Sequence, residues 1–308
     1  MSRNSYLNQC ALIIGHRKSK SVRNLQSESW DCGTKIGAGL IGCGSIGTVI
    51  AEAVVDGRAG DIELVAVYDL IRERAEKLVK SLAKKPATTK NADELLENKN
   101  IQIVVEAASQ EAVRQYAAKA LIEGKDIMVM SAGALLDDNL FKRISDLAQE
   151  KGRKVYVPSG AIVGLDSVKS AAVARVEEVT LTTRKPPLSF EGAPFVERRK
   201  IDLSSIKKPM VLYEGPAKEA VKLFPQNVNV SAALSLAGIG ADRTKVRIIT
   251  DPRVKEITHE IHVKGDFGQL RTKTFNRPFP TNPKTSYIAA LSAIATLRKI
   301  SGSIVVGT

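Results

Sequence analysis

Short apolar runs alternate with amphipathic segments from residue 35 to about residue 165. The runs have the length of buried strands, and the segments between them repeat apolar residues at helical spacing. The pattern predicts strands at 64–68, 101–105, 126–130 and 154–157, with helices at 71–82, 111–123 and 137–152. Strands that alternate with helices of this length indicate an α/β domain with a Rossmann-type, doubly wound parallel sheet.

A different pattern follows residue 165, where apolar and polar residues alternate within shorter segments. These segments are 179–183, 211–213, 245–249, 257–263 and 270–275. Their alternation favours a second, α+β domain whose mixed or antiparallel sheet has one solvated face. The last segment, 285–300, predicts a helix that returns to the first domain. It places one stripe of apolar side chains, Tyr287, Leu291, Ile294 and Leu297, on one helical face.

These patterns divide the chain into an N-terminal extension and two domains. Residues 1–34 are polar, basic and irregular, and we expect them to lie outside the fold. Residues 35–165 are predicted to form a dinucleotide-binding domain, with 281–308 packing back on it. Residues 166–280 are predicted to form the catalytic domain, which would bind the substrate.

The first predicted turn carries a glycine motif, because an apolar run leads into Gly42, Gly44 and Gly47 and a helical pattern follows. The first glycine of such a motif permits a tight turn, the second lets backbone approach a pyrophosphate, and the third lets the helix pack on the strand. Asp69 ends the next strand about twenty residues further on, where a carboxylate holds ribose hydroxyls. The motif predicts a site for NAD or NADP built by Gly42, Gly44, Ser45, Ile46, Gly47 and Asp69.

Small residues follow three further strands, at 107–109, 131–133 and 159–161. Ligands of doubly wound sheets bind beyond the carboxyl ends of the strands. These segments, with Ala108 and Ser109 among them, are therefore the expected wall of the cofactor site.

The choice between the two cofactors depends on the residues around Asp69. Its carboxylate favours NAD by repelling a 2′-phosphate, but Arg72 and Arg74 follow closely enough to accommodate one. We expect NAD to be preferred, and use of both cofactors stays open.

Composition limits the classes of protein that fit this pattern. With 308 residues, of which 44% are hydrophobic, the chain can bury the cores of two modest domains, and no apolar run is long enough to span a bilayer. The three cysteines lack metal-ligand spacing, and Cys43 lies inside the glycine loop, where a disulfide would obstruct a ligand. We expect a cytoplasmic protein without a membrane segment or a metal site.

The net charge of +13 raises the question of a nucleic-acid partner. Nucleic-acid binding needs basic residues gathered on one face, but here they are spread along the chain, and aromatic residues make up only 5% of it. A basic surface that attracts an anionic cofactor and substrate accounts for the charge better. We expect a small-molecule substrate and no nucleic-acid partner.

Histidine is scarce, which narrows the search for a group that transfers protons near neutral pH. His16 lies in the extension, so His259 and His262 remain. Alternation along the strand at 257–263 puts His259 on the apolar face and His262 on the solvated face. A histidine on an apolar face is either a satisfied core residue or a catalytic residue, and spacing leaves both interpretations of His259 open.

Asn227 and Asn229 open a predicted helix after Pro225. Asparagine at a helix start usually caps backbone amides, and spacing favours this role. Presentation of one carboxamide to a ligand is the alternative.

Seven segments together carry a family resemblance: 39–47, 105–109, 158–166, 183–187, 224–230, 258–261 and 281–286. The glycine motif is common to many dehydrogenases, whereas Pro-Ser-Gly-Ala at 158–161 and Asn-Val-Asn-Val at 227–230 are more particular. On these segments the chain resembles the L-aspartate dehydrogenase family from Lys35 to its end. The resemblance implies reversible oxidative deamination of L-aspartate through iminosuccinate to oxaloacetate and ammonia. It also implies a role in NAD biosynthesis and a homodimer.

The resemblance also implies roles for individual residues. The family's active-site histidine, a general acid/base, falls on His259, and the residues that hold the nicotinamide cofactor fall on Ala161 and Asn229. Candidates for binding the two substrate carboxylates, from their motif positions, are Arg184, Lys185 and Lys284. One position departs from the family pattern, since Ile257 stands where many members have asparagine.

Two other functions fit parts of the pattern. One is a different reductase on the same scaffold, of the dihydrodipicolinate or homoserine type. The other is a non-catalytic nucleotide-sensing or nucleic-acid-binding protein, which the net charge suggests. An ammonia-dependent reduction of oxaloacetate would separate aspartate dehydrogenase from both.

Overall fold

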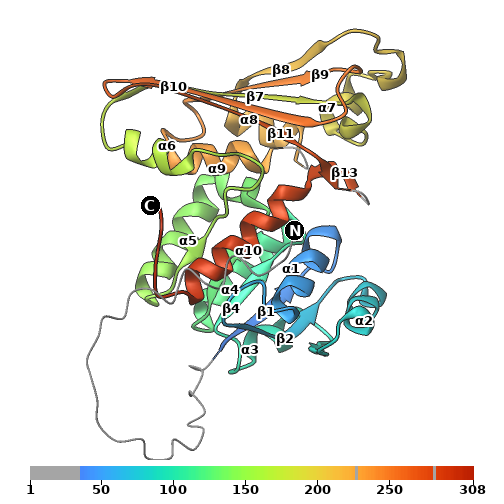
Figure 1. The fold of residues 1–308 in the computed structure, drawn as a ribbon, viewed down its shortest axis with the longest axis vertical. Helices are drawn as coiled ribbons and strands as arrows, with labels where there is room; N and C mark the ends of the chain where they lie inside the picture. Colours follow the sequence, from blue (N-terminus) through green and yellow to red (C-terminus); the bar gives the residue numbers. More distant parts are fainter. Residues whose placement is uncertain (1–34, 226–227, 280–281) are drawn as a thin grey trace, which may run out of the picture. The chain divides into compact units, whose positions relative to one another are not determined.

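The computed structural model describes residues 35–225, 228–279 and 282–308 (Figure 1), apart from the side chains of Pro283 and Lys284. The extension predicted for 1–34 lies outside the described residues. In the described part, no helix combines the length and the apolar character needed to cross a membrane.

Six of the described strands form a parallel sheet in the order β3-β2-β1-β4-β5-β6. They are β1 (Ile36–Ile41), β2 (Ile62–Tyr68), β3 (Ala87–Thr88), β4 (Ile103–Glu106), β5 (Asp126–Val129) and β6 (Val155–Tyr156). The predicted Rossmann-type sheet is confirmed. The strand order reverses between β1 and β4, which is the switch point where such sheets bind ligands.

Helices cover both faces of this sheet, and each face has its own apolar core. The helices are α1 (Ser45–Val55), α2 (Arg72–Ser81), α3 (Ala92–Glu97), α4 (Gln110–Ile122) and α5 (Asp138–Glu150), with a short 3-10 helix η1 (Ala132–Leu136) after β5. Ile50 of α1 and Leu78 of α2 share one core with Ile103 of β4. Leu95 of α3 and Val113 of α4 share the other with Ile127 of β5.

The C-terminal helix α10 (Tyr287–Ser301) belongs to the first of these cores and lies beside α1 (Figure 1). The backbone N–H of Asp61 also donates to the Ser301 hydroxyl at 3.1 Å. Two of the four residues predicted for the apolar stripe are not buried, because Tyr287 and Leu291 are 40% and 38% exposed. The prediction was wrong for these two residues. The buried face of α10 consists of Ala290, Ala293, Ile294 and Leu297.

The second sheet has five of the described strands in the order β11-β10-β7-β9-β8 (Figure 1). They are β7 (Val176–Lys185), β8 (Met210–Pro216), β9 (Thr244–Thr250), β10 (Ile257–Gly265) and β11 (Gly268–Asn276). The β7–β9 pair is parallel and the other pairs are antiparallel, so the sheet is mixed.

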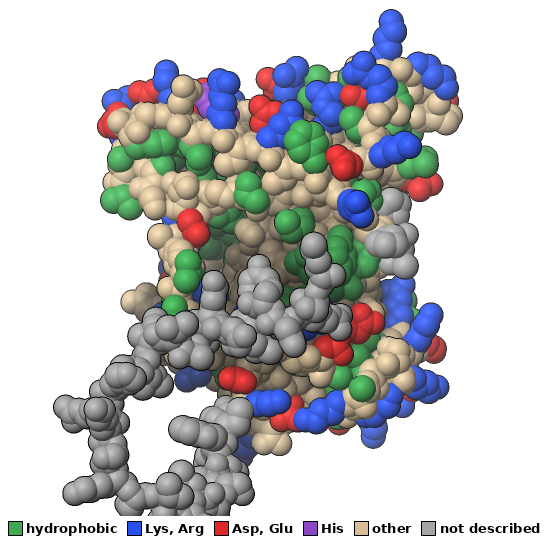
Figure 2. Space-filling model, viewed as in Figure 1, with side chains coloured by type: hydrophobic (Ala, Val, Ile, Leu, Met, Phe, Trp, Pro, Cys, Tyr) green, Lys and Arg blue, Asp and Glu red, His purple; other side chains and the backbone are tan. Residues whose placement is uncertain are grey.

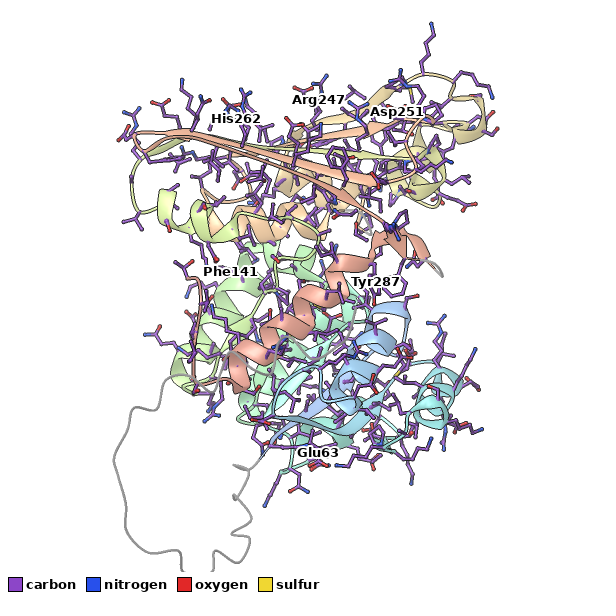
Figure 3. All side chains as sticks on the ribbon, in the orientation of Figure 1. Glu63, Phe141, Arg247, Asp251, His262 and Tyr287 are labelled. Carbon is purple, nitrogen blue, oxygen red and sulfur yellow. The ribbon has the colours of Figure 1, made fainter. Side chains whose placement is uncertain are left out.

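One face of this sheet packs on helices α6 (Leu165–Ala171), α8 (Ala217–Leu223) and α9 (Asn229–Ala237). The remaining described elements are shorter: η2 (Pro187–Phe190), α7 (Pro194–Arg198), η3 (Leu203–Ser205), β12 (Pro278–Phe279) and β13 (Asn282–Ser286). Figure 3 shows His262 and Arg247 on the opposite, outer face. His262 lies where alternation puts it, but its Nε2 is buried and without a hydrogen-bond partner rather than solvated.

Charged side chains mix on the face of the molecule that Figure 2 shows. Lys and Arg side chains lie among Asp and Glu side chains and do not form one continuous patch there. Many basic groups have acidic partners close by, such as Lys119 with Asp93 and Lys142 with Asp146.

Candidate functional site

The turn between β1 and α1 accepts only glycine at two of its motif positions. Gly42 has a φ of +102°, and a Cβ there would lie 2.7 Å from the backbone of Ala107. A Cβ on Gly47 would lie 1.9 Å from the carbonyl oxygen of Gly42. Gly44 instead faces open space, and no side chain caps the start of α1, which leaves room for the phosphates of a cofactor.

Asp69 joins this turn to the end of β2. Its Oδ2 accepts the backbone N–H of Cys43 at 2.7 Å, and its Oδ1 accepts that of Ile71 at 2.8 Å. A cavity opens beside it, lined by predicted cofactor residues and by others: Gly42, Gly44, Tyr68, Asp69, Arg74, Ala108, Ser109 and Tyr116. The position of Asp69 fits a carboxylate that binds the adenosine ribose.

Glu106, at the end of β4, holds the wall of this cavity that Ala108 and Ser109 form, and it was not among the site residues predicted from the sequence. Its buried carboxylate accepts the backbone N–H groups of Ala108 at 2.8 Å, Ser109 at 2.9 Å and Ser131 at 3.0 Å, and the Ser131 hydroxyl at 2.8 Å. Burial raises the pKa of this carboxyl, and these hydrogen bonds oppose the rise. Glu106 therefore holds two of the predicted loops in one arrangement. The sequence feature that could have revealed Glu106 is a charged residue at the end of an otherwise apolar strand.

A second cavity contains the predicted residues of the nicotinamide end together with candidates for the chemistry. Its lining includes Ile46, Met130, Ala161, Lys185, Asn229, His259, Thr285 and Ser286. Ile46 extends from the glycine turn, whereas Lys185 and His259 come from β7 and β10 of the second sheet. The fold thus brings the cofactor motif and the scarce histidine to one place.

His259 is 3% exposed, and its Nδ1 lies 2.9 Å from the Thr183 hydroxyl. Burial, with a smaller contribution from the charge of Lys185, lowers the pKa of His259 from 6.5 to about 3. The imidazole is therefore uncharged at neutral pH. Its burial is what a core histidine would show, but its place in the lining of the second cavity is what a catalytic histidine would show.

Lys185 shares this environment and is only 4% exposed. Burial lowers the pKa of its ammonium group from 10.5 to about 7. Lys185 lies two residues from Thr183 on β7, so both face the same side of the sheet as His259, which pairs with Thr183 across the strands.

The other two substrate candidates are not in this cavity's described lining. Arg184 points to the other face of β7, where Nη1 binds the buried Oδ2 of Asp251 at 2.8 Å. Arg253 binds the same carboxylate, and these partners lower the pKa of Asp251 to about 2. Arg184 thus has a structural partner, and the side chain of Lys284 lies outside the described residues.

Asn229 is the first residue of α9, whose cap is Val228, so the favoured capping interpretation was wrong for it. Its Oδ1 accepts the backbone N–H of Gly133 at 3.1 Å. The carboxamide therefore connects α9 to the loop after β5, and it lines the second cavity. Asn227 lies outside the described residues.

In the described part of the chain, no group of three or more His, Cys, Asp or Glu residues is placed to hold a metal ion. The glycine turn, Asp69 and the two neighbouring cavities instead define a Rossmann-type oxidoreductase that binds a nicotinamide dinucleotide.

Comparison with known proteins identifies the family. Residues 166–300 match the model described as aspartate dehydrogenase, C-terminal, and residues 42–158 match that of the homoserine dehydrogenase NAD binding domain. L-aspartate dehydrogenase of Methanosarcina barkeri is 50% identical over 270 residues, which are 88% of this chain and 98% of that protein. That of Nitrosopumilus maritimus is 45% identical, over 87% of this chain and 98% of that protein. The chain belongs to the L-aspartate dehydrogenase family.

Two solved structures resemble this chain in fold. Aspartate dehydrogenase from Thermotoga maritima has a TM-score of 0.67 at 26% identity, and the match covers 88% of this chain and 99% of that one. Myo-inositol dehydrogenase from Lactobacillus casei, in complex with NAD(H) and myo-inositol, has a TM-score of 0.53 at 15% identity, over 87% of this chain and 84% of that one. The second likeness concerns the fold alone. The family resemblance and NAD or NADP as the cofactor, both predicted from the sequence, are confirmed.

Proposed function

We propose that this enzyme catalyses the reversible oxidative deamination of L-aspartate to oxaloacetate and ammonia through iminosuccinate. The observation that carries the proposal is the second cavity, where His259 and Lys185 lie with Ala161 and Asn229. The 50% identity to an L-aspartate dehydrogenase over 88% of the chain supports the same substrate.

The first cavity is proposed to hold the adenosine half of the cofactor, with Asp69 on the ribose and the glycine turn on the pyrophosphate. Ala161 and Asn229 would then contact the nicotinamide end. A cofactor held there would supply the redox chemistry, which is acceptance of a hydride from the substrate α-carbon. The protein would place the cofactor and the substrate in reacting position. The domain of residues 35–165 and 281–308 would hold the cofactor, and the domain of 166–280 would hold the substrate against it.

The substrate is a dicarboxylate, so its site needs cationic or hydrogen-bonding groups. In the second cavity the described polar side chains include those of Lys185, His259, Thr285 and Ser286. We propose that this set orients the substrate α-amine and carboxylates, with Lys284 as a further candidate. Arg184 is a weaker one because its guanidinium is bound to Asp251.

The test is NADH oxidation by the purified protein supplied with oxaloacetate, with and without ammonium. Oxidation that requires ammonium, together with NAD reduction by L-aspartate, is the expected result. Oxidation without ammonium would instead indicate a malate-type reduction. A His259→Ala variant that binds NADH but has lost turnover would place the histidine in the reaction.

We further propose that the enzyme is a cytoplasmic homodimer that supplies NAD biosynthesis. The buried free thiol of Cys43 beside the cofactor turn suits a reducing compartment. The dimer and the metabolic role follow from the family resemblance. Sedimentation of the purified protein tests the first, and growth of a deletion strain with and without added NAD precursor tests the second.

A further inference from the structure

We propose that Asn276 is a positioning residue of this enzyme, whose side-chain amide sets the place of the nicotinamide against the sheet that carries His259. It acts through Ala161, one of the two residues proposed above to contact the nicotinamide end. The proposal deepens the aspartate dehydrogenase function proposed above and rests on it. It assigns Asn276 no chemical step of its own.

Asn276 is the last residue of β11, and it is buried. Its Nδ2 donates to the carbonyl oxygen of Ala161 at 2.9 Å and to the hydroxyl of Thr274 at 3.1 Å. The Thr274 hydroxyl in turn donates to the same Ala161 oxygen at 3.2 Å. Only the nitrogen of a carboxamide can donate to a carbonyl, so these acceptors fix which way the amide of Asn276 is turned. Two side chains of one strand thus hold the carbonyl of Ala161.

The turn that contains Ala161 is held from a second side as well. The backbone N–H of Gly160 donates to the hydroxyl of Ser292 on α10 at 3.0 Å. Helix α10 packs in a core of the first domain, whereas β11 belongs to the second sheet. The turn after β6 is therefore tied to both domains, and Asn276 provides a link to the second.

The register of β10 and β11 connects this link to the histidine. Ile257 pairs with Asn276 across the two strands, and His259 pairs with Thr274. The Thr274 hydroxyl, which contacts the Ala161 carbonyl, also lies 3.4 Å from the carbonyl oxygen of His259. Ala161 and His259 line the same cavity. Loss of the bond from Asn276 would therefore change the distance between the nicotinamide side of the cavity and the histidine side.

Hydride transfer is sensitive to this distance, because the reacting atoms have to approach to about 3–3.5 Å in an aligned geometry. A misplacement of about 1 Å costs on the order of 100-fold in rate. Cofactor binding depends less on this turn, since the adenosine half is proposed to occupy the other cavity, beside Asp69 and Gly44. Loss of the bond from Asn276 should therefore slow hydride transfer far more than it weakens cofactor binding.

The first test removes the donor with Asn276→Leu, a side chain of similar size. Stopped-flow absorbance should show NADH formation from L-aspartate in a single turnover slowed about 100-fold, with the Kd for NADH changed less than about threefold. Thr244→Val is the matched control. The Thr244 hydroxyl is also buried and donates to a backbone carbonyl, that of Gly240 at 2.8 Å, but Thr244 lines neither cavity. The control should lose stability in thermal melts without slowing hydride transfer.

The second test restores the donor by protonation in Asn276→Asp. A carboxylate at this position cannot donate to the Ala161 carbonyl, whereas the protonated acid has an O–H that replaces the amide N–H. Burial raises the pKa of such a carboxyl. The transfer rate of Asn276→Asp, divided by that of the wild type, should therefore rise as the pH falls from about 9 to about 6. The same ratio for Asn276→Leu should stay low at every pH, and a merely structural loss would not follow pH.

The possible outcomes distinguish this proposal from the function on which it rests. A wild type that forms no NADH with L-aspartate overturns both. An active wild type with an Asn276→Leu variant that transfers hydride at a similar rate overturns the role of Asn276 alone. A loss confined to NADH affinity would also overturn it, because that result defines a binding residue. If Asn276→Leu does not fold, Asn276→Asp decides, and a ratio to the wild type that is independent of pH overturns the proposal.

Discussion

The hydroxyl of Thr183 on β7 lies 2.9 Å from Nδ1 of His259 on β10, in a buried contact. The contact follows from the pairing of β7 with β10, which sets these two residues opposite each other. Both side chains are 3% exposed, so solvent does not compete for the bond. Thr183 therefore fixes the orientation of the ring and leaves Nε2 for the cavity.

Thr183→Val should remove the hydrogen bond to His259 while keeping the shape of the side chain. We expect kcat for aspartate oxidation to fall about tenfold or more, with little change in the KM for NAD, because the ring loses its oriented tautomer. Thr183→Ser keeps the hydroxyl and should retain most of the activity. Steady-state kinetics of the two variants provide the comparison, and equal activity would show that the contact is only structural.

Glu106→Gln should weaken cofactor binding and stability together. The neutral side chain offers one acceptor oxygen where the carboxylate offers two, so at least one of the buried donors loses its partner. We expect a loss of roughly 2 kcal/mol of unfolding free energy and a higher KM for NAD. Urea denaturation and kinetics measure the two effects. Glu97→Gln, on an exposed side chain at the end of α3, is the matched control. An increase in stability would show that burial of the charge outweighs its hydrogen bonds.

The parts of the site that depend on local sequence could be predicted. The glycine turn needs residues without a Cβ at Gly42 and Gly47, and Asp69 has to end the next strand, so short-range spacing reveals both. Alternation along one strand was also enough to place His259 on the buried face.

The rest depends on contacts between distant segments. The partnership of Thr183 with His259 joins residues 76 positions apart, and that of Gly133 with Asn229 joins residues 96 apart. No spacing rule reaches that far, so Asn229 was interpreted as a cap. The buried face of α10 was predicted wrongly for another reason. Its close contact with α1 selects Ala290 and Ala293, which hydrophobic patterns weigh less than Tyr287 and Leu291.

Lys185→Met should make the protein more stable at neutral pH. The folded pKa of Lys185 is about 7, below its ordinary 10.5, so between these values the unfolded chain binds a proton that the folded chain does not. Wild-type stability therefore rises with pH across this window, and the variant lacks that dependence. We expect a gain of about 4 kcal/mol near pH 7 that shrinks toward pH 10. Thermal melts at several pH values would measure it, and a gain independent of pH would contradict the lowered pKa.

Asn229→Leu should raise the KM for NAD by about tenfold, because the buried N–H of Gly133 loses its acceptor and the loop after β5 shifts. Asn229→Asp keeps the acceptor but removes the amide donor. If it restores the KM, the bond to Gly133 accounts for the effect. If it does not, the amide itself binds the cofactor. Fluorescence titration with NADH measures both variants, and an unchanged affinity in Asn229→Leu would exclude either role.

Asp69 and Arg74 should together decide between NAD and NADP. Both line the adenosine cavity, whereas Arg72 is paired with Glu76 at 2.8 Å. We expect the wild type to prefer NAD, and Asp69→Ser to raise the ratio of kcat/KM for NADP to that for NAD by about tenfold or more, because the repulsion of a 2′-phosphate is lost. In that background Arg74→Ala should reverse the gain and Arg72→Ala should not, because only Arg74 lines the cavity. A wild type that uses both cofactors with equal efficiency would show that Asp69, with both oxygens bound to Cys43 and Ile71, does not exclude the phosphate.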